Sequence, residues 1–398
     1  MVDDQTTQNT SGNNNTSGNG GQTSSQGLVS AIEANVSPSG VMVSWLKASN
    51  ENRWTVEYGE TGFTQGNGTS GDNAASIGPF GVTRISGLSA STTYDLYIAV
   101  AGASNSAVVS FTTLNIDESV YSIFLNDSLC TVNIEQQLDV SSSYVENVNG
   151  NVRSFSINDI PNHLVGTFPT PQDRRIGNPN TISAQDNNYS TTTQPVKANT
   201  TTGVRGYVNG VLFSGVGVEV YTAERFTGFT GQTNTAWTRT GLQSMEDLGL
   251  DCNNAHVQPT GQYHYHGLPN AYGTTLEIDG TQMVKVGYAA DGFPYYYLYF
   301  QQDNGTMKEA TASYALKSGT RGGNGITAPS GTYDGEYFED FEFVNGLGDL
   351  DECNGRFGST PDNADGEYYY VVTKNFPSFP LCFSGTPDDS FRFGGGPP

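Results

Sequence analysis

The sequence has few basic residues, few histidines and no long apolar run. Lysine and arginine together number 17 against 40 aspartate and glutamate residues, which gives a net charge of −23. A surface this acidic repels phosphate backbones and anionic bilayers, so nucleic-acid and membrane-surface roles are disfavoured. No apolar run reaches the roughly 18 residues of a membrane-spanning helix, and we expect no transmembrane segment. Divalent cations and neutral glycans are the partners that suit this charge.

The first residues also lack the basic and apolar regions of a signal peptide. Either the chain stays inside the cell or a signal has been removed from this version. We assign residues 1–27 to a disordered polar tether, because Asn, Gly, Ser, Thr and Gln make up almost all of it. Tethers of this kind often follow the anchor cysteine of bacterial surface lipoproteins, which is absent here. We therefore expect an extracellular or cell-surface protein whose signal, with or without a lipid anchor, is missing from this sequence.

Cysteine is scarce but even in number. Four cysteines are compatible with two disulfides in an oxidising compartment, with three connectivities to choose from, or with four free thiols inside a cell. Pairing Cys353 with Cys382 closes a C-terminal loop and leaves Cys130 for Cys252. This is our first choice among the three.

What the sequence does contain predicts an all-β protein. Glycine (49 residues), tyrosine (22) and phenylalanine (20) are abundant, as in proteins with many short strands and tight turns. Apolar residues alternate with polar ones over residues 41–45 and again over 54–58, which predicts two strands joined by a polar loop. Residues 88–94, leading into a further alternating strand, resemble the tyrosine-corner segment of fibronectin type III domains, with Ala90 where proline is usual. We expect residues 28–114 to form such a β-sandwich, most simply as a spacer.

Residues 115–398 predict a larger β-rich domain with few short helices, for which residues 244–248 and 306–316 are the candidates. The strand expected over residues 295–300 is informative. Tyr295, Tyr297 and Tyr299 would share one face and Tyr296, Leu298 and Phe300 the other, so both faces must be covered. We therefore interpret it as a core strand rather than a platform for stacking glycans.

Three of the four histidines fall between His256 and His266. Side chains two apart on a strand share one face, so His264 and His266 project together, and the intervening loop brings His256 back to them. Three imidazoles with an open position suit zinc or copper. Two alternatives stay open: imidazoles that only form structural hydrogen bonds, and an acid/base cluster without metal.

The histidine segment has an echo further along the chain. Residues 250–253 (LDCN) ahead of 261–266 (GQYHYH) are repeated as residues 351–354 (DECN) ahead of 366–371 (GEYYYV). This pattern predicts an internal duplication with two similarly built hairpins. Tyr369 and Val371 stand in the second copy where His264 and His266 stand in the first. The tyrosines shared by both copies would then hold the fold, and the histidines would be the replaceable, functional part.

Several segments together resemble the bacterial proteins named for a Tyr-His-Tyr-His (YHYH) motif. They are IPNH and GTFP (160–163, 166–169), NPN (178–180), YVNGV (207–211), the segment 252–266, GYAADGFP (287–294) and LDECNG (350–355). The resemblance covers most of residues 115–390. It implies one coherent domain, but no activity, because the family is poorly characterised. His163, in the first of these motifs, is a fourth candidate ligand of the same pocket.

Acidic residues supply weaker candidates. Asp291, in a turn of the GYAADGFP motif, is either an outer-sphere carboxylate partner of the metal or a turn residue that bonds its own backbone. A calcium site formed by Asp251, Asp351 and Glu352 is conceivable, although no EF-hand spacing supports it.

The sequence thus predicts a secreted or surface-anchored protein that binds copper or zinc through a histidine cluster, with metal-dependent oxidation or hydrolysis as an open further step. The alternative is an adhesion or glycan-binding surface module in which the histidines are structural. We assign no catalytic residue.

Overall fold

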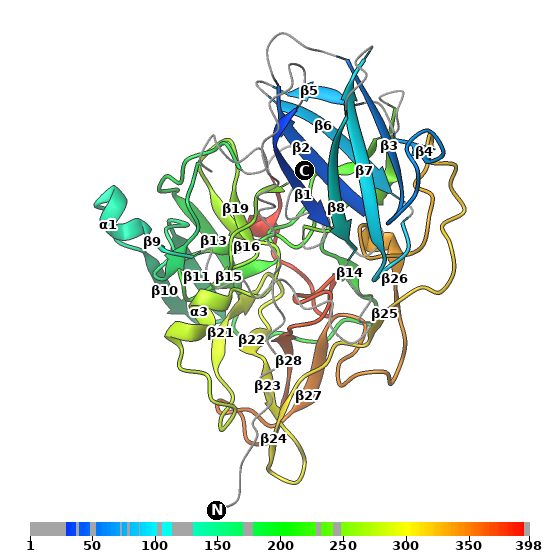
Figure 1. Cartoon of the computed structure of the whole chain (residues 1–398). Coiled ribbons are helices and arrows are strands. Elements are labelled where there is room, and N and C mark those ends of the chain that lie inside the picture. Colours follow the sequence, from blue (N-terminus) through cyan, green and yellow to red (C-terminus); the bar gives the residue numbers. More distant parts are fainter. Residues whose placement is uncertain are drawn as a thin grey trace, which may run out of the picture. The chain divides into compact units, whose positions relative to one another are not determined.

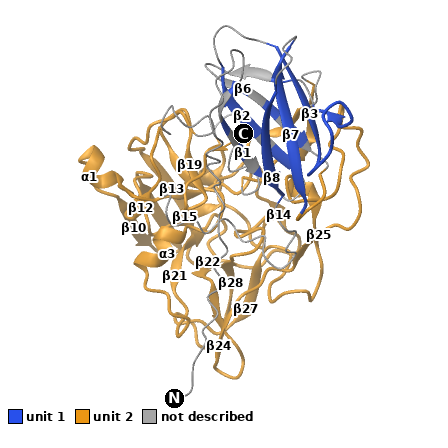
Figure 2. Ribbon diagram, in the orientation of Figure 1, with its two compact units in different colours: residues 1–36, 40–85, 92–113 blue, residues 37–39, 86–91, 114–398 orange. Residues whose placement is uncertain are grey.

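The structure is a computed structural model. It describes residues 29–36, 40–47, 53–71, 74–77, 80–86, 88–101, 106–113, 130–169, 178–227, 232–241 and 248–393. The expected tether and most of the expected helical turn at 244–248 lie outside these residues. The chain divides into two compact units (Figure 2), the first made of residues 1–36, 40–85 and 92–113 and the second of the rest. No described helix is long and apolar enough to cross a membrane.

The first unit is a β-sandwich of two four-stranded sheets, ordered β1-β2-β6-β5 and β4-β3-β7-β8. Trp45 and Trp54 meet edge to face between them, with ring centroids 5.4 Å apart, and Leu96 and Ile98 complete this core. The predicted alternation therefore places its apolar side chains inside the sandwich. The strands are β1 Ser30–Val36, β2 Gly40–Leu46, β3 Trp54–Glu60, β4 Thr69–Ser70, β5 Ala75–Ile77, β6 Phe80–Ser86, β7 Thr93–Val100 and β8 Ala107–Thr112.

The second unit is built on an eight-stranded sheet, ordered β19-β20-β16-β15-β21-β22-β28-β27 (Figure 1). Its strands are β15 Gly210–Leu212, β16 Gly217–Val218, β19 Ala255–Val257, β20 Tyr263–Tyr265, β21 Lys285–Ala289, β22 Pro294–Tyr297, β27 Gly355–Gly358 and β28 Glu367–Val372. The predicted all-β class, with few short helices, is confirmed.

Smaller elements surround this sheet. One is a three-stranded sheet with the order β10-β11-β13. The others are five two-stranded ribbons, which pair β12 with β9, β14 with β29, β17 with β18, β23 with β24 and β25 with β26. The elements are β9 Val132–Asn133, α1 Ile134–Leu138, β10 Tyr144–Asn149, β11 Val152–Ile157, β12 Leu164–Val165, β13 Asn187–Thr192, β14 Thr202–Gly203, β17 Arg225–Thr227, β18 Thr233–Thr238, α3 Asn270–Thr275, β23 Tyr299–Gln301, β24 Met307–Glu309, β25 Tyr314–Leu316, η2 Phe338–Asp340, β26 Phe341–Phe343, β29 Cys382–Phe383 and η3 Asp389–Phe391.

The eight-stranded sheet has a local two-fold symmetry that confirms and extends the predicted duplication. In each half an antiparallel hairpin (β15–β16 or β21–β22) lies beside a second hairpin (β19–β20 or β27–β28), and the two are joined by a parallel pairing, β16 with β20 or β22 with β28. The halves meet at β15 and β21, where Val211 pairs with Tyr288. Each repeat therefore has four strands, of which the sequence echo revealed only the outer two.

In the structure, the two copies of the repeated segment align one residue away from the alignment that matches Cys252 with Cys353. Asn254 and Asn354 both have a left-handed backbone (φ 51° and 60°), and their amides bond the carbonyls of Asp251 and Asp351. The turn thus matches Asn254 with Asn354, and Cys353 occupies the place of Asn253. An acidic residue and a left-handed asparagine therefore recur in this turn in both repeats. Cys252 and Cys353 are not at equivalent positions, because each belongs to a different disulfide.

Two local predictions need correction. The strand expected over residues 295–300 is interrupted at Leu298, whose φ of 61° turns the chain between β22 and β23. Residues 306–316 form strands β24 and β25 rather than helical turns. The core assignment is confirmed, because Tyr295 and Tyr297 pack into the main core cluster and Tyr296 into another.

Both disulfides join the pairs that we preferred. Cys130 is bonded to Cys252, and Cys353 to Cys382. No cysteine is free.

Candidate metal centre

The hairpin β19–β20 positions the three clustered histidines. His256 pairs directly with His264 across its two strands. His266 follows β20, and its amide bonds the carbonyl of Asn254. Tyr263 and Tyr265 belong to the main hydrophobic core, as strand alternation predicts, and this leaves the histidines on the other face. The hairpin itself therefore brings the three imidazoles together.

The three imidazoles converge through their Nε2 atoms. His266 Nε2 lies 3.1 Å from His264 Nε2 and 3.1 Å from His256 Nε2. Each Nδ1 faces a backbone carbonyl: Leu248 O at 2.9 Å from His256, Gln262 O at 3.5 Å from His264 and Val220 O at 3.5 Å from His266. An Nδ1 proton donated to these carbonyls leaves every Nε2 lone pair free, the tautomer that metal ligation requires.

These distances match a metal site closely. Three nitrogens at 2.0–2.1 Å from one tetrahedral zinc ion are about 3.3 Å apart. His264 and His266 are buried and His256 is half-buried, so the cluster approaches solvent at His256. The three side chains can hold a metal ion and leave a further coordination position open.

A carboxylate that the sequence did not single out lies beside this cluster. Glu219 directly follows β16, and its Oε2 lies 4.0 Å from His264 Nε2. Gln258 donates an amide hydrogen bond of 2.9 Å to the same oxygen, and Gln262 one of 3.3 Å to Oε1. Nothing in the local sequence marks Glu219, since the parallel pairing of β16 with β20 is what brings it to the histidines.

Burial keeps the three imidazoles neutral and disfavours the charge of Glu219 as long as no cation lies beside it. Desolvation, with repulsion between neighbouring imidazoles, lowers the pKa of His264 well below its usual value, and lowers that of His266 to about 3. Desolvation also lowers the pKa of His256. Burial, reinforced by the negative charge of Asp159, raises the pKa of Glu219 to about 8. Neutral imidazoles are the form that binds metal ions.

His163 is not brought to the cluster. Its Nε2 lies 2.6 Å from the Tyr265 hydroxyl, and its Nδ1 lies 2.9 Å from the Leu164 carbonyl. Ser214 bonds the same hydroxyl at 2.8 Å. Burial lowers the pKa of His163 to about 4. The residue thus sits with Tyr265, whose side chain packs in the core, and its hydrogen bonds there are satisfied.

The acidic candidates lie elsewhere as well. Asp291 accepts hydrogen bonds from the Tyr370 hydroxyl (2.6 Å) and the Gly385 amide (2.8 Å), and burial raises its pKa to about 6. Asp251 accepts from Tyr263 and from the Gly166 amide, and Asp351 accepts from Tyr368. Hydrogen-bond donors, rather than further oxygen ligands, thus surround the carboxylates of Asp251, Asp291 and Asp351.

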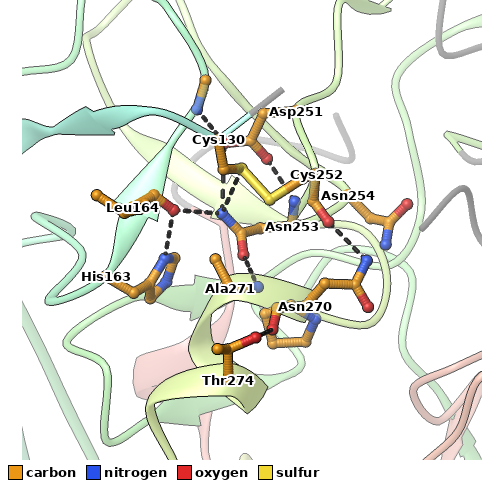
Figure 3. Close-up of a disulfide and its surroundings, with 12 residues drawn as sticks. Cys130, His163, Leu164, Asp251, Cys252, Asn253, Asn254, Asn270, Ala271 and Thr274 are labelled. Carbon is orange, nitrogen blue, oxygen red and sulfur yellow. Dashed lines mark hydrogen bonds between the residues drawn. A yellow bond between two sulfur atoms is a disulfide. The ribbon is translucent and has the colours of Figure 1, made fainter. Parts of the chain in front are cut away.

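A disulfide anchors the turn that leads into β19. Figure 3 shows Asn253 beside the Cys130–Cys252 bond. Its side-chain amide donates to the Leu164 carbonyl at 2.9 Å, and its oxygen accepts from the Ala271 amide at 2.8 Å. The segment that carries His256 is therefore fixed covalently and by hydrogen bonds.

The second repeat shows what the fold needs at the same positions. The strand pairings match His256 with Arg356, His264 with Tyr369, His266 with Val371 and Glu219 with Tyr296. Tyr296, Tyr369 and Val371 belong to one hydrophobic cluster, in which the two tyrosine rings meet edge to face at 5.2 Å. By contrast, the scaffold contact is kept, since Tyr263 bonds Asp251 and Tyr368 bonds Asp351. Two tyrosines and a valine can therefore fill most of this place in the fold, with the half-buried Arg356 beside them.

Comparison with known protein families finds one whose name matches the Tyr-His-Tyr-His segment at residues 263–266 of this site. A family model described as YHYH protein matches residues 188–385. This part of the chain belongs to the YHYH protein family. The match takes in all eight strands of the central sheet, both hairpins and Glu219. No curated protein matches the chain.

Three solved structures each resemble a small part of the chain. A redesigned β-sandwich protein is 22% identical over 23% of this chain and 97% of its own, with a TM-score of 0.19. The sensor domain of the anti-sigma factor RsgI4 of Pseudobacteroides cellulosolvens is 17% identical over 22% and 96%, with a TM-score of 0.18. The central fibronectin-III array of RIM-binding protein is 16% identical over 32% and 42%, with a TM-score of 0.18.

Proposed function

We propose that this YHYH protein binds a transition metal ion, zinc or copper, through His256, His264 and His266. The observation that carries the proposal is the convergence of three Nε2 atoms whose Nδ1 partners are all backbone carbonyls. Imidazole nitrogens at such separations repel one another unless a proton or a metal ion lies between them. A metal ion satisfies all three lone pairs at once.

The repeat supports the same function. The residues that hold the hairpin are common to both repeats, whereas the polar residues of the cluster are confined to the first. Burying three imidazoles and a carboxylate is costly where apolar side chains would fill the space. Retention of these groups in one repeat is explained by a ligand that needs them. The two disulfides favour an oxidising, extracellular setting for this function.

The alternative of a glycan-binding module draws little support from the tyrosines of the central sheet. Tyrosines 263, 265, 295, 296, 369 and 370 are fully buried and serve as core. We therefore keep metal binding as the single proposal, and leave open whether the bound metal catalyses a reaction.

Metal content tests the proposal. Purified protein is incubated with Zn²⁺ or Cu²⁺, dialysed and analysed for metal by elemental mass spectrometry. We expect about one ion per chain in the wild type and none in a variant with the second-repeat residues, His256→Arg/His264→Tyr/His266→Val. His163→Gln is the matched control, since it removes the one histidine outside the cluster, and it should retain the ion. Equal metal content in the wild type and the triple variant would refute the proposal.

A further inference from the structure

Glu219 is a buried carboxylate without a cationic partner among its described contacts. Its side chain is only 5% exposed. Its polar neighbours are the amides of Gln258 and Gln262 and the imidazole of His264. A buried carboxylate is stable in its charged form only when hydrogen bonds and an opposite charge accompany it. The amides supply the hydrogen bonds, and the opposite charge is missing.

The position of Glu219 shows where that charge would come from. Two atoms bound to the same ion at 2.0–2.1 Å can be at most about 4.2 Å apart. Glu219 Oε2, at 4.0 Å from His264 Nε2, lies at the edge of the space that the ligands of such an ion occupy. An ion held by the three imidazoles therefore lies next to this carboxylate in a dry environment, where electrostatic attraction is strong.

The repeat assigns Glu219 to the same functional set as the histidines. Its equivalent is Tyr296, and the contact of Glu219 with His264 is replaced in the second repeat by the contact of Tyr296 with Tyr369. The carboxylate and the histidines are thus present together in one repeat and absent together in the other. This pattern is expected if Glu219 acts on the bound ion.

We infer that Glu219 makes the site selective for a divalent ion, Zn²⁺ or Cu²⁺, over cuprous ion. This inference rests on the proposed function, because it concerns the ion that the three histidines hold. Imidazole suits both zinc and copper, and three neutral imidazoles carry no charge that would favour a divalent ion over Cu⁺. The Glu219 carboxylate, charged when a bound cation supplies the missing opposite charge, attracts a 2+ ion twice as strongly as a 1+ ion. Glu219 is therefore a specificity-determining residue, and Gln258 and Gln262 orient its carboxylate.

The test compares Glu219→Gln with the wild type, using Zn²⁺ and, under anaerobic reducing conditions, Cu⁺, each in competition with a chromophoric chelator. Loss of the charge should weaken Zn²⁺ binding about 10- to 100-fold, the range seen when outer partners of metal ligands are removed. Cu⁺ affinity should fall only about 3- to 10-fold, the square root of the Zn²⁺ effect, because a 1+ ion experiences half the attraction. An equal loss for both ions would overturn the inference, because Glu219 would then act only by orienting His264. No loss for either ion would overturn it as well.

Two further variants serve as controls. Glu219→Asp keeps the charge and should keep the preference for Zn²⁺ even if its affinity falls, whereas loss of that preference would contradict a role for charge. Glu367→Gln removes an acid at the position equivalent to Gln262 in the second repeat, and should bind both ions like the wild type. Wild-type protein that binds neither ion would refute the proposed function itself, an outcome distinct from an unselective Glu219→Gln variant.

Discussion

The four histidines occupy two different environments. His256, His264 and His266 direct their Nε2 atoms at one another, whereas His163 bonds Tyr265. Sequence alone could identify the cluster, because scarce histidines at His-x-His spacing on a strand must share a face. It could not separate His163 from the cluster, since a family motif carries no information about which face of the sheet its side chain meets.

Glu219 marks the limit of prediction at this scale. It reaches His264 only through a parallel pairing of strands distant in sequence. Parallel pairings need crossover connections, and no local pattern specifies which strands they join.

The lowered pKa of His163 predicts a pH-dependent stability. Its pKa is 6.5 in the unfolded chain and about 4 in the fold, because burial penalises the charged ring. The unfolded chain therefore binds more protons between these values, and stability present above pH 6.5 is lost as the pH falls. Acidification from about pH 7.5 to pH 5 should therefore lower the free energy of unfolding by about 2 kcal/mol through this group.

Chemical denaturation of the wild type and His163→Gln at both pH values checks this prediction. The variant should lose about 2 kcal/mol less than the wild type on acidification. The clustered histidines are present in both proteins, so their contribution cancels. Identical losses would mean that His163 is charged in the fold.

At the scale of elements, the paired hairpins explain why only half of the repeat was visible in the sequence. The outer hairpins keep an acidic turn and two tyrosines, because Tyr263–Asp251 and Tyr368–Asp351 are the same contact. The inner strands β15 and β21 share mainly a glycine, since Val211 in one repeat is Tyr288 in the other. Backbone pairing fixes their geometry and leaves most side chains free to diverge.

That shared glycine predicts matched effects of mutation. A Cβ at Gly210 would overlap the Tyr288 carbonyl, and a Cβ at Gly287 would overlap the Val211 carbonyl. Gly210→Ala and Gly287→Ala should each lower the free energy of unfolding by about 3 kcal/mol or more, because the two central strands must separate.

Thermal unfolding of both variants, with Gly322→Ala as control, measures this effect. A Cβ at Gly322 meets no atom within 4 Å, so the control should unfold like the wild type. A large loss in only one of the two central variants would contradict the two-fold equivalence of β15 and β21.

At the scale of the whole molecule, the disulfides close loops of very different length. Cys130 and Cys252 are 122 residues apart, and Cys353 and Cys382 only 29. From the loss of loop-closure entropy in the unfolded chain, the disulfide of the longer loop should stabilise the fold by about 5 kcal/mol and that of the shorter loop by about 4 kcal/mol. Cys130→Ser/Cys252→Ser should therefore destabilise the protein more than Cys353→Ser/Cys382→Ser, as denaturant titration would measure. It should also weaken metal binding, because Cys252 anchors the turn into β19. The reverse order of stability would contradict this account.

The division into residues 28–114 and 115–398 stays a prediction. If these are independent domains, calorimetry of the full chain should show two transitions, and excised residues 28–114 should reproduce one of them. A single transition of the full chain, together with no transition in excised residues 28–114, would contradict independent folding.

Fold class was predictable because glycine- and aromatic-rich composition and alternating strands act locally. The order of the eight strands was not, since it depends on pairings between strands far apart in the chain.

The central claim is that the three Nε2 atoms hold one metal ion. Anomalous diffraction at the zinc edge, from crystals of zinc-loaded protein, tests it most directly. The account predicts one peak about 2.0–2.1 Å from Nε2 of His256, His264 and His266. Zinc-loaded crystals with no peak between these imidazoles, or with the ion bound elsewhere, would contradict it.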